Sequence, residues 1–156
     1  MLTLLRPGLE PLEIEFLFLD FEGTLASDGR IHPKAKDKIN LLSKRIGICI
    51  FVKGNHGLPE KTFGKMKAEV VYLREGPSAK QKLDRLQEAG ADRTVVIGNG
   101  LDDGPVIEAA GFGICVIGRE GASREAVRKA DLVVTSVLGA FDFLLKPLRQ
   151  KATIGK

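Results

Sequence analysis

The chain has 156 residues, with 20 acidic and 24 basic side chains and a net charge of +4. This length indicates one domain spanning 1–156, and a hydrophobic content of 44% is enough for a core and excludes a disordered chain. The basic residues are interleaved with acidic ones, so the charge indicates small anionic partners such as phosphates at most. A nucleic acid is not expected as a partner, because Trp is absent and Tyr occurs once.

Apolar runs alternate with amphipathic segments from residue 14 onward. The apolar runs predict strands at 14–19, 46–52, 68–73, 94–97, 112–117 and 132–134. The segments between them predict helices at 33–45, directly after Pro59, and at 77–89, 103–110, 122–129 and 136–145. Residues 24–32 predict a hairpin that turns at Asp28-Gly29. Apolar strands that alternate with helices indicate an α/β fold with a doubly wound parallel sheet.

The two ends of the chain are expected to lie outside this core, which covers about residues 14–146. The start is a short lead that Arg6, Pro7 and Gly8 interrupt, so it does not read as a signal peptide. The tail from Lys146 is basic and is expected to fray. The longest uncharged stretches are ten residues, about half a membrane span. We therefore expect a cytoplasmic protein with no membrane partner.

The two cysteines, Cys49 and Cys115, each lie inside an apolar run. With only two histidines and no CxxC in the chain, this placement predicts buried, reduced thiols and not a zinc site.

Charged side chains follow the predicted strands. In doubly wound folds, ligands bind beyond the carboxyl ends of the strands. The residues at those positions are Asp20, Lys53, Arg74 and the loop 98–104. Carboxylates from two strand ends, with a lysine nearby, suit a hard divalent cation and a phosphate. A lone Asp20 could be a turn residue, and Asp102-Asp103 could cap the next helix, but together they favour a binding site.

Two segments resemble motifs of the haloacid dehalogenase (HAD) superfamily. The first motif, usually written DxDGT, is similar to FLFLDFEGTL at 16–25, and the fourth, of the form GDGxND, is similar to GNGLDD at 98–103. Lys82 falls where the lysine of the third motif should lie. The stretch GFGICVIGREGAS at 111–123 is similar to the archaeal-type, soluble P-type ATPase-like members. The resemblance implies a Rossmannoid three-layer fold without a cap domain, in which only the hairpin at 24–32 covers the site.

The resemblance also implies a Mg²⁺-dependent phosphohydrolase that forms an aspartyl-phosphate on Asp20. Glu22 would offer its backbone carbonyl to Mg²⁺ and its carboxylate as general acid and base. Lys82 would stabilise the phosphoryl charge, with Lys80 as a weaker candidate. The implied residues are, for catalysis, Asp20, Glu22 and Lys82; for phosphate binding, Gly23, Thr24, Lys53 and Gly54; and for the metal, Asp20, Glu22, Asn99 and Asp103.

Three positions depart from the family pattern. Glu22 is one methylene longer than the usual Asp, and displacing an acid by about 1 Å can lower a rate about a hundredfold. Lys53 stands where a hydroxyl is usual, so it could bind phosphate or pair with Asp20. Asn99 replaces a carboxylate, and Asp102 occupies the usual Asn position. We expect weak Mg²⁺ binding, with Lys53 partly supplying the charge of the metal.

Two other functions remain open. The departures favour a catalytically inactive HAD-like binding or assembly protein as the main alternative. A phospho-accepting receiver domain ranks last, because Gly23-Thr24-Leu25 after Asp20 does not fit it. For the enzyme we expect a small phosphorylated substrate and a homo-oligomer in which a second subunit screens the site.

Several other side chains near the site could have a role. Arg30 and His32 could reach a substrate, but they are expected to be solvated. His56 could act as an acid or bind phosphate, although a loop histidine with no visible partner is more often incidental. The segment 119–121 could bind an anion before a helix, but a capping turn is expected there.

Overall fold

The computed structural model describes residues 1–54 and 60–154. Its centre is a six-stranded parallel sheet with the order β10-β9-β8-β3-β6-β7. The strand bounds are β3 Phe16–Asp20, β6 Gly47–Lys53, β7 Glu69–Leu73, β8 Thr94–Gly98, β9 Phe112–Val116 and β10 Leu132–Val134. The predicted parallel sheet is confirmed.

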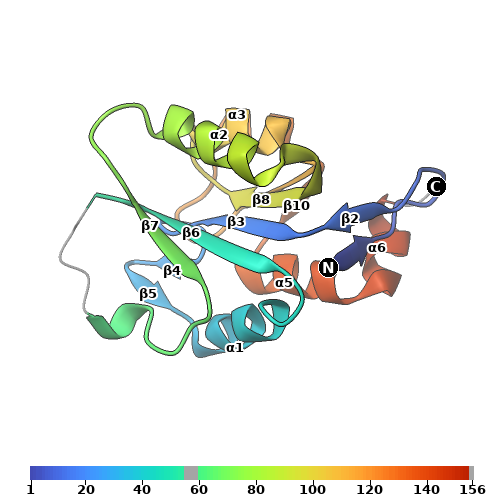
Figure 1. Cartoon of the computed structure of the whole chain (residues 1–156), viewed down its shortest axis with the longest axis horizontal. Coiled ribbons are helices and arrows are strands. Elements are labelled where there is room, and N and C mark those ends of the chain that lie inside the picture. The colour runs from blue at the N-terminus through green and yellow to red at the C-terminus, as the bar shows by residue number, and fades with distance from the viewer. Residues whose placement is uncertain (55–59, 155–156) are drawn as a thin grey trace.

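Helices cover both faces of this sheet (Figure 1). On one face, α2 and α3 pack with α4 over a core that includes Phe18 and Phe51, and on the other α1 and α5 pack over a core that includes Leu17 and Leu19. The helix bounds are α1 Pro33–Leu42, α2 Ser78–Ala89, α3 Asp103–Ala109, α4 Arg124–Lys129, α5 Val137–Leu145 and α6 Pro147–Ile154, with short 3₁₀ helices η1 Glu60–Thr62 and η2 Ala91–Arg93. The doubly wound, three-layer fold is therefore confirmed.

The register brings the carboxyl ends of three strands together. Asp20 of β3 lies opposite Phe51 of β6, and Leu19 lies opposite Ile97 of β8. Each strand is followed at this edge by a loop. The predicted hairpin is β4 Ala26–Ser27 and β5 Arg30–Ile31, and we call residues 24–32 the flap.

The two thiols lie on β6 and β9, which are separated by β3 and β8 in the sheet order. Both Cys49 and Cys115 are free and buried, as predicted.

Within the described residues, no helix is long and apolar enough to cross a membrane. His56 lies outside the described residues.

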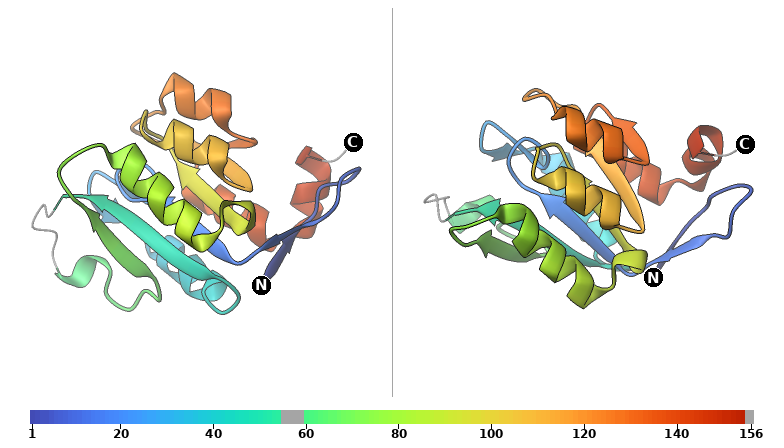
Figure 2. Two further views of the ribbon diagram at one scale, coloured as in Figure 1. Left: turned by 45° about the horizontal axis from the view of Figure 1, so that its top comes forward. Right: turned by 90° about the horizontal axis from the view of Figure 1, so that it is seen from above.

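The two ends of the chain differ from the prediction. β1 (Leu2–Leu4) pairs with β2 (Leu12–Ile14) as an antiparallel hairpin, so the strand expected at 14–19 is divided: Ile14 ends β2 and Phe16 begins β3. The tail does not fray over 147–154 but forms α6, which lies beside the β1–β2 hairpin (Figure 2).

Gln150 joins these two segments. Its side chain is completely buried. Its Oε1 accepts a hydrogen bond from the Leu5 N–H at 2.8 Å, and its Nε2 donates to the Phe143 carbonyl at 2.9 Å. A buried polar side chain with its hydrogen bonds made explains why the tail is ordered.

Candidate functional site

A tight turn after β3 presents Asp20 at the edge of the sheet. The Leu25 N–H donates to the Asp20 carbonyl at 3.2 Å, and the Ala26 N–H donates to the Phe21 carbonyl at 2.8 Å. Gly23 within this turn has a φ of +74°, and a Cβ there would lie 2.3 Å from Asn99 Nδ2. Only glycine fits that position, because it has no Cβ and adopts positive φ freely.

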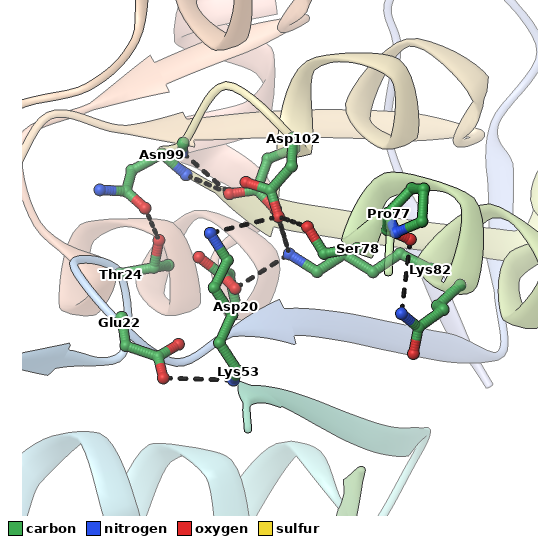
Figure 3. Close-up of polar contacts among 12 residues, drawn as sticks. Asp20, Glu22, Thr24, Lys53, Pro77, Ser78, Lys82, Asn99 and Asp102 are labelled. Atoms are coloured by element: carbon green, nitrogen blue, oxygen red, sulfur yellow. Dashed lines mark hydrogen bonds and ion pairs between the residues drawn. The ribbon is translucent and has the colours of Figure 1, made fainter. Parts of the chain in front are cut away.

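Lys82 of α2 is the centre of a largely buried group of charges, which we call the Lys82 cluster (Lys82, Asp20, Asp102 and Asp103). Figure 3 shows Lys82 with Asp20 and Asp102. Its ammonium donates to Asp20 Oδ1 at 3.0 Å, to Asp102 Oδ2 at 3.1 Å and to Asp103 Oδ1 at 2.8 Å. Three acceptors use all three donors of an ammonium group. Burial opposes the charged form of Lys82, but the carboxylates outweigh it and raise the pKa of Lys82.

The structure distinguishes the two candidate lysines. Lys80 is exposed and pairs with Asp84 on its own helix at 3.0 Å, whereas the Lys82 side chain is 2% exposed. Lys82 is therefore the lysine that reaches Asp20.

One carboxylate oxygen of Asp20, Oδ1, accepts a hydrogen bond from Lys82. Burial raises the pKa of Asp20 well above its usual value, and repulsion from Asp103 adds to this, while Lys82 opposes it. Within the described residues, no hydrogen bond reaches the second carboxylate oxygen, Oδ2. One oxygen of Asp20 is thus fixed by Lys82, and the other is available to a ligand.

Asp103, the first residue of α3, organises the loop after β8. Its Oδ2 accepts from the N–H groups of Asn99 at 3.0 Å and Gly100 at 2.9 Å. A Cβ on Gly98 would lie 2.5 Å from Asp103 Cγ, so this close approach requires glycine. Both oxygens of Asp103 are therefore engaged by the protein.

Asp102, which the sequence grouped with Asp20 and Asp103 but did not assign to the metal, belongs to the same cluster. Ser78 Oγ donates to Asp102 Oδ2 at 2.6 Å, and the Lys53 ammonium lies 3.5 Å from the same oxygen. Burial alone would raise the pKa of Asp102, but Ser78, Lys82 and Lys53 outweigh it, so the pKa is lowered. Ser78 is the residue of this group that the sequence did not predict; its only signal was its position four residues before Lys82, on the same face of the helix.

Lys53 and Glu22 meet at the end of β6. The Lys53 N–H donates to Glu22 Oε1 at 3.2 Å, and Glu22 Oε2 is buried without a partner among the described residues. The Lys53 side chain is 51% exposed. Its ammonium pairs with Asp102 and not with Asp20, whose ion-pair partner is Lys82. Gly54 follows directly, with a φ of +66°.

Thr24 and Asn99 bond to each other. Thr24 Oγ1 donates to Asn99 Oδ1 at 3.0 Å, and Asn99 Nδ2 donates to the Gly121 carbonyl at 3.4 Å. The amide oxygen that was predicted to face a metal therefore accepts the Thr24 hydroxyl. The segment before α4 is a capping turn as expected, since Ser123 Oγ accepts from the Ala126 N–H at 3.1 Å.

The atoms at this edge that could coordinate a metal ion are oxygens, the ligand type that Mg²⁺ prefers. They include Asp20 Oδ2 and the main-chain carbonyl of Glu22, which the hydrogen bonds of the turn leave unused. No group of three or more His, Cys, Asp or Glu side chains in residues 1–54 and 60–154 is arranged to hold a metal ion. Mg²⁺ retains several waters in proteins, so this small set fits it, with few protein ligands.

No model of a known protein family matches the chain. The uncharacterized protein MJ0073 of Methanocaldococcus jannaschii is 39% identical over 72 residues, which make up 46% of this chain and 77% of that protein.

Solved structures of phosphatases share the fold. The cobalt-bound deoxy-D-mannose-octulosonate 8-phosphate phosphatase of Haemophilus influenzae is 16% identical, with a TM-score of 0.70 over 91% of this chain and 92% of that one. The 3-deoxy-D-manno-octulosonate 8-phosphate phosphatase of Moraxella catarrhalis, solved with magnesium, phosphate and KDO, is 15% identical, with a TM-score of 0.71 over 90% and 91%.

A protein of Streptomyces avermitilis assigned to the HAD family of hydrolases is 22% identical, with a TM-score of 0.68 over 92% of each chain. The chain belongs to the same family as the M. jannaschii protein MJ0073, and its fold is that of the HAD superfamily.

Proposed function

We propose that this protein hydrolyses a small phosphate ester through an aspartyl-phosphate on Asp20, with Mg²⁺ as cofactor. The observation that carries this proposal is the buried Lys82 ammonium, which fixes one oxygen of Asp20 and leaves the other without a hydrogen bond from the described residues. The HAD fold, shared with two phosphatases, supports the same reaction.

In the first step, Asp20 Oδ2 attacks phosphorus and the bond from phosphorus to the leaving oxygen breaks. Glu22 supplies the proton to that oxygen. Its Oε1 is held by the Lys53 N–H and its Oε2 has no partner within the described residues, so one oxygen positions the carboxyl and the other is available for proton transfer.

In the second step, the Glu22 carboxylate takes a proton from water, which attacks phosphorus and releases phosphate and the Asp20 carboxylate. Lys82 offsets negative charge on the phosphoryl group. Gly23 and Thr24 form the turn beside the phosphoryl position, and Lys53 and Gly54 at the end of β6 are proposed to contact phosphoryl oxygens.

The Mg²⁺ ligands would be the Asp20 carboxylate, the Glu22 carbonyl, and the side chains of Asn99 and Asp103. When bound, the ion supplies charge stabilisation to the phosphoryl group. Asn99 Oδ1 already accepts the Thr24 hydroxyl, and Asp103 already accepts three hydrogen bonds. These existing bonds compete with the ion, so we propose that Mg²⁺ binds weakly and that turnover is slow.

A phosphate-release assay on small phosphomonoesters with Mg²⁺ tests the proposal. We expect the wild type to release phosphate and Asp20→Asn to give only background. Lys80→Ala, which alters an exposed lysine on the same helix, is the matched control and should match the wild type. Equal background in the wild type and Asp20→Asn would contradict the enzymatic function.

A second candidate is a catalytically inactive HAD-like protein that binds a ligand or assembles with a partner. The observation that favours it is the pairing of Lys53 with Asp102, which adds a cation where the family has a hydroxyl. The same assay separates the two functions. We further propose a homo-oligomer, because the resemblance implies no cap domain and a second subunit would then screen the site; light scattering on a sizing column would measure its mass.

A further inference from the structure

A cavity lies beside the turn that carries Asp20. It has a volume of about 310 Å³ and is bounded by the flap, by Val116 at the end of β9 with Gly118 and Arg119 after it, and by residues 135–138 at the start of α5. It shares Gly23 and Thr24 with the Asp20 turn, but no member of the Lys82 cluster lines it. The cavity therefore adjoins the candidate active site through Gly23 and Thr24 but does not include the Lys82 cluster.

The ionisable side chains that line this cavity are Arg30, Arg119 and His32, and the Nδ1 atom of His32 caps α1 by accepting from the Lys34 N–H at 3.1 Å. Within the described part of the chain, neither arginine forms an ion pair, whereas Arg85, Arg93 and Arg128 all do. Uncompensated guanidinium groups around a hollow attract an anion.

Two acidic residues lie near this cavity, Asp28 in the flap and Glu120 after β9, and the Glu120 carboxylate is engaged elsewhere. Its Oε1 accepts from the Asp28 N–H at 3.2 Å. Its Oε2 would lie 2.8 Å from a Cβ on Gly23, so Glu120 lies against the Asp20 turn and ties the flap to the loop after β9. It is not among the residues that line the cavity.

Neutral donors and apolar side chains (Leu25, Ala26, Val116, Val137 and Leu138) make up the rest of the lining. Ser27 lines the cavity, and its hydroxyl is buried without a hydrogen-bond partner among the described residues. Ser136 caps α5 by accepting the Gly139 N–H at 3.0 Å, and the first-turn residues Val137 and Leu138 also line the cavity. The amino end of a helix carries partial positive charge and free N–H groups.

We propose that this cavity binds a carboxylate or phosphate group. Its volume is at the lower limit of small-molecule sites, which suits a small anion or one end of a larger ligand. Two sources share this chemistry: a second anionic group of the substrate, or a separate small anion.

Titration of ¹⁵N-labelled protein with malonate, monitored by the positions of its amide signals, tests the site without using turnover. We expect saturable shifts at residues 118–121 and 135–139. The double variant Arg30→Gln/Arg119→Gln should bind at least tenfold more weakly. Arg124→Gln, an exposed arginine on α4 that does not line the cavity, is the control and should bind as the wild type does.

The site would be overturned if the shifts do not saturate, or if they stay confined to residues 98–103. It would also be overturned if the double variant binds malonate with the same affinity as the wild type. Loss of affinity in the double variant together with a changed spectrum throughout the protein would point to unfolding. The single variants Arg30→Gln and Arg119→Gln, each with an intact spectrum, must then show weaker binding for the site to stand.

A kinetic comparison identifies the source of the anion, and it alone rests on the proposed phosphatase function. The two esters, butyl phosphate and 4-phosphonooxybutanoate, differ in a terminal carboxylate. A preference in kcat/KM for the carboxylate ester that the double variant loses assigns the cavity to the substrate. Equal kcat/KM values, with malonate binding retained, assign it to a separate anion. If neither ester is turned over, the proposed function fails while malonate still tests the cavity.

Discussion

The Lys82 ammonium donates a hydrogen bond of 3.0 Å to Asp20 Oδ1, although the two residues lie 62 positions apart in the chain. Their side chains are 2% and 5% exposed. Buried charges of this kind are stabilised chiefly by one another, so removing one leaves the others uncompensated. The bond therefore links the candidate active site to the stability of the fold.

Replacing Lys82 by Met should destabilise the protein strongly. The variant keeps the length of the side chain but leaves the buried Asp20 and Asp103 carboxylates without their cation. We expect the free energy of unfolding at pH 7 to fall by about 3–5 kcal/mol, measured by urea denaturation.

The control for this variant is Lys80→Met. Lys80 is 73% exposed and pairs only with the exposed Asp84, and such pairs contribute little. We expect its urea midpoint to match the wild type. Equal midpoints for Lys82→Met and Lys80→Met would show that the Lys82 cluster does not stabilise the fold.

Replacing Lys53 by Thr should tighten Mg²⁺ binding. The Lys53 ammonium lies 3.5 Å from Asp102 Oδ2, so its removal makes the site more negative by one charge. We expect the Kd for Mg²⁺ to fall by about threefold to tenfold at low salt, measured by isothermal titration.

Salt should weaken this effect, because Lys53 is half exposed and screening acts on exposed charges. Lys80→Thr removes a lysine of the same exposed kind and should leave the Kd unchanged. Micromolar affinity in the wild type that stays the same in Lys53→Thr would refute the idea that Lys53 supplies part of the metal's charge.

The sequence predicted the central strands closely because they are buried on both faces. The strands expected at 94–97 and 112–117 are observed at Thr94–Gly98 and Phe112–Val116. Their fixed parallel register brings Asp20 and the loop after β8 to one edge, so the convergence of Asp20, Lys82 and Asp103 followed from topology and motif order.

The parts that were missed depend on contacts between distant residues. The β1–β2 hairpin and α6 are short, and the Leu5–Gln150 bond between them spans 145 positions, which no local pattern reveals. Ser78 and the pairing of Lys53 with Asp102 were not predicted for a similar reason: which acceptor Lys53 and Ser78 select depends on the conformation of the loop after β8.

Replacing Gln150 by Ala should loosen the terminal helix. The change leaves the Leu5 N–H and the Phe143 carbonyl without their buried partner. Unsatisfied buried groups of this kind cost about 1–3 kcal/mol, so we expect a loss of that size in the free energy of unfolding and faster hydrogen exchange at the Leu5 amide. Lys151→Ala alters the exposed neighbour on α6 and should change neither. Unchanged exchange at Leu5 in Gln150→Ala would contradict this role of Gln150.

The two cysteines should be unreactive in the folded protein. Burial raises the pKa of the Cys49 thiol to about 12, with the Glu69 carboxylate adding to the effect. Burial also raises the pKa of Cys115 to about 11, with a contribution from Asp103. A raised thiol pKa means that the protonated form dominates at pH 8, where about one thiol in a thousand or fewer is ionised, and the thiolate is the reactive species.

We therefore expect no rapid reaction with a disulfide reagent such as DTNB in the native state at pH 8, and two equivalents after unfolding in guanidinium. Cys49→Ser and Cys115→Ser identify the thiol responsible if one reacts. Fast reaction of either thiol in a protein with a native amide spectrum would contradict this prediction. For Cys115, which is completely buried, it would also show that the sheet opens at that strand.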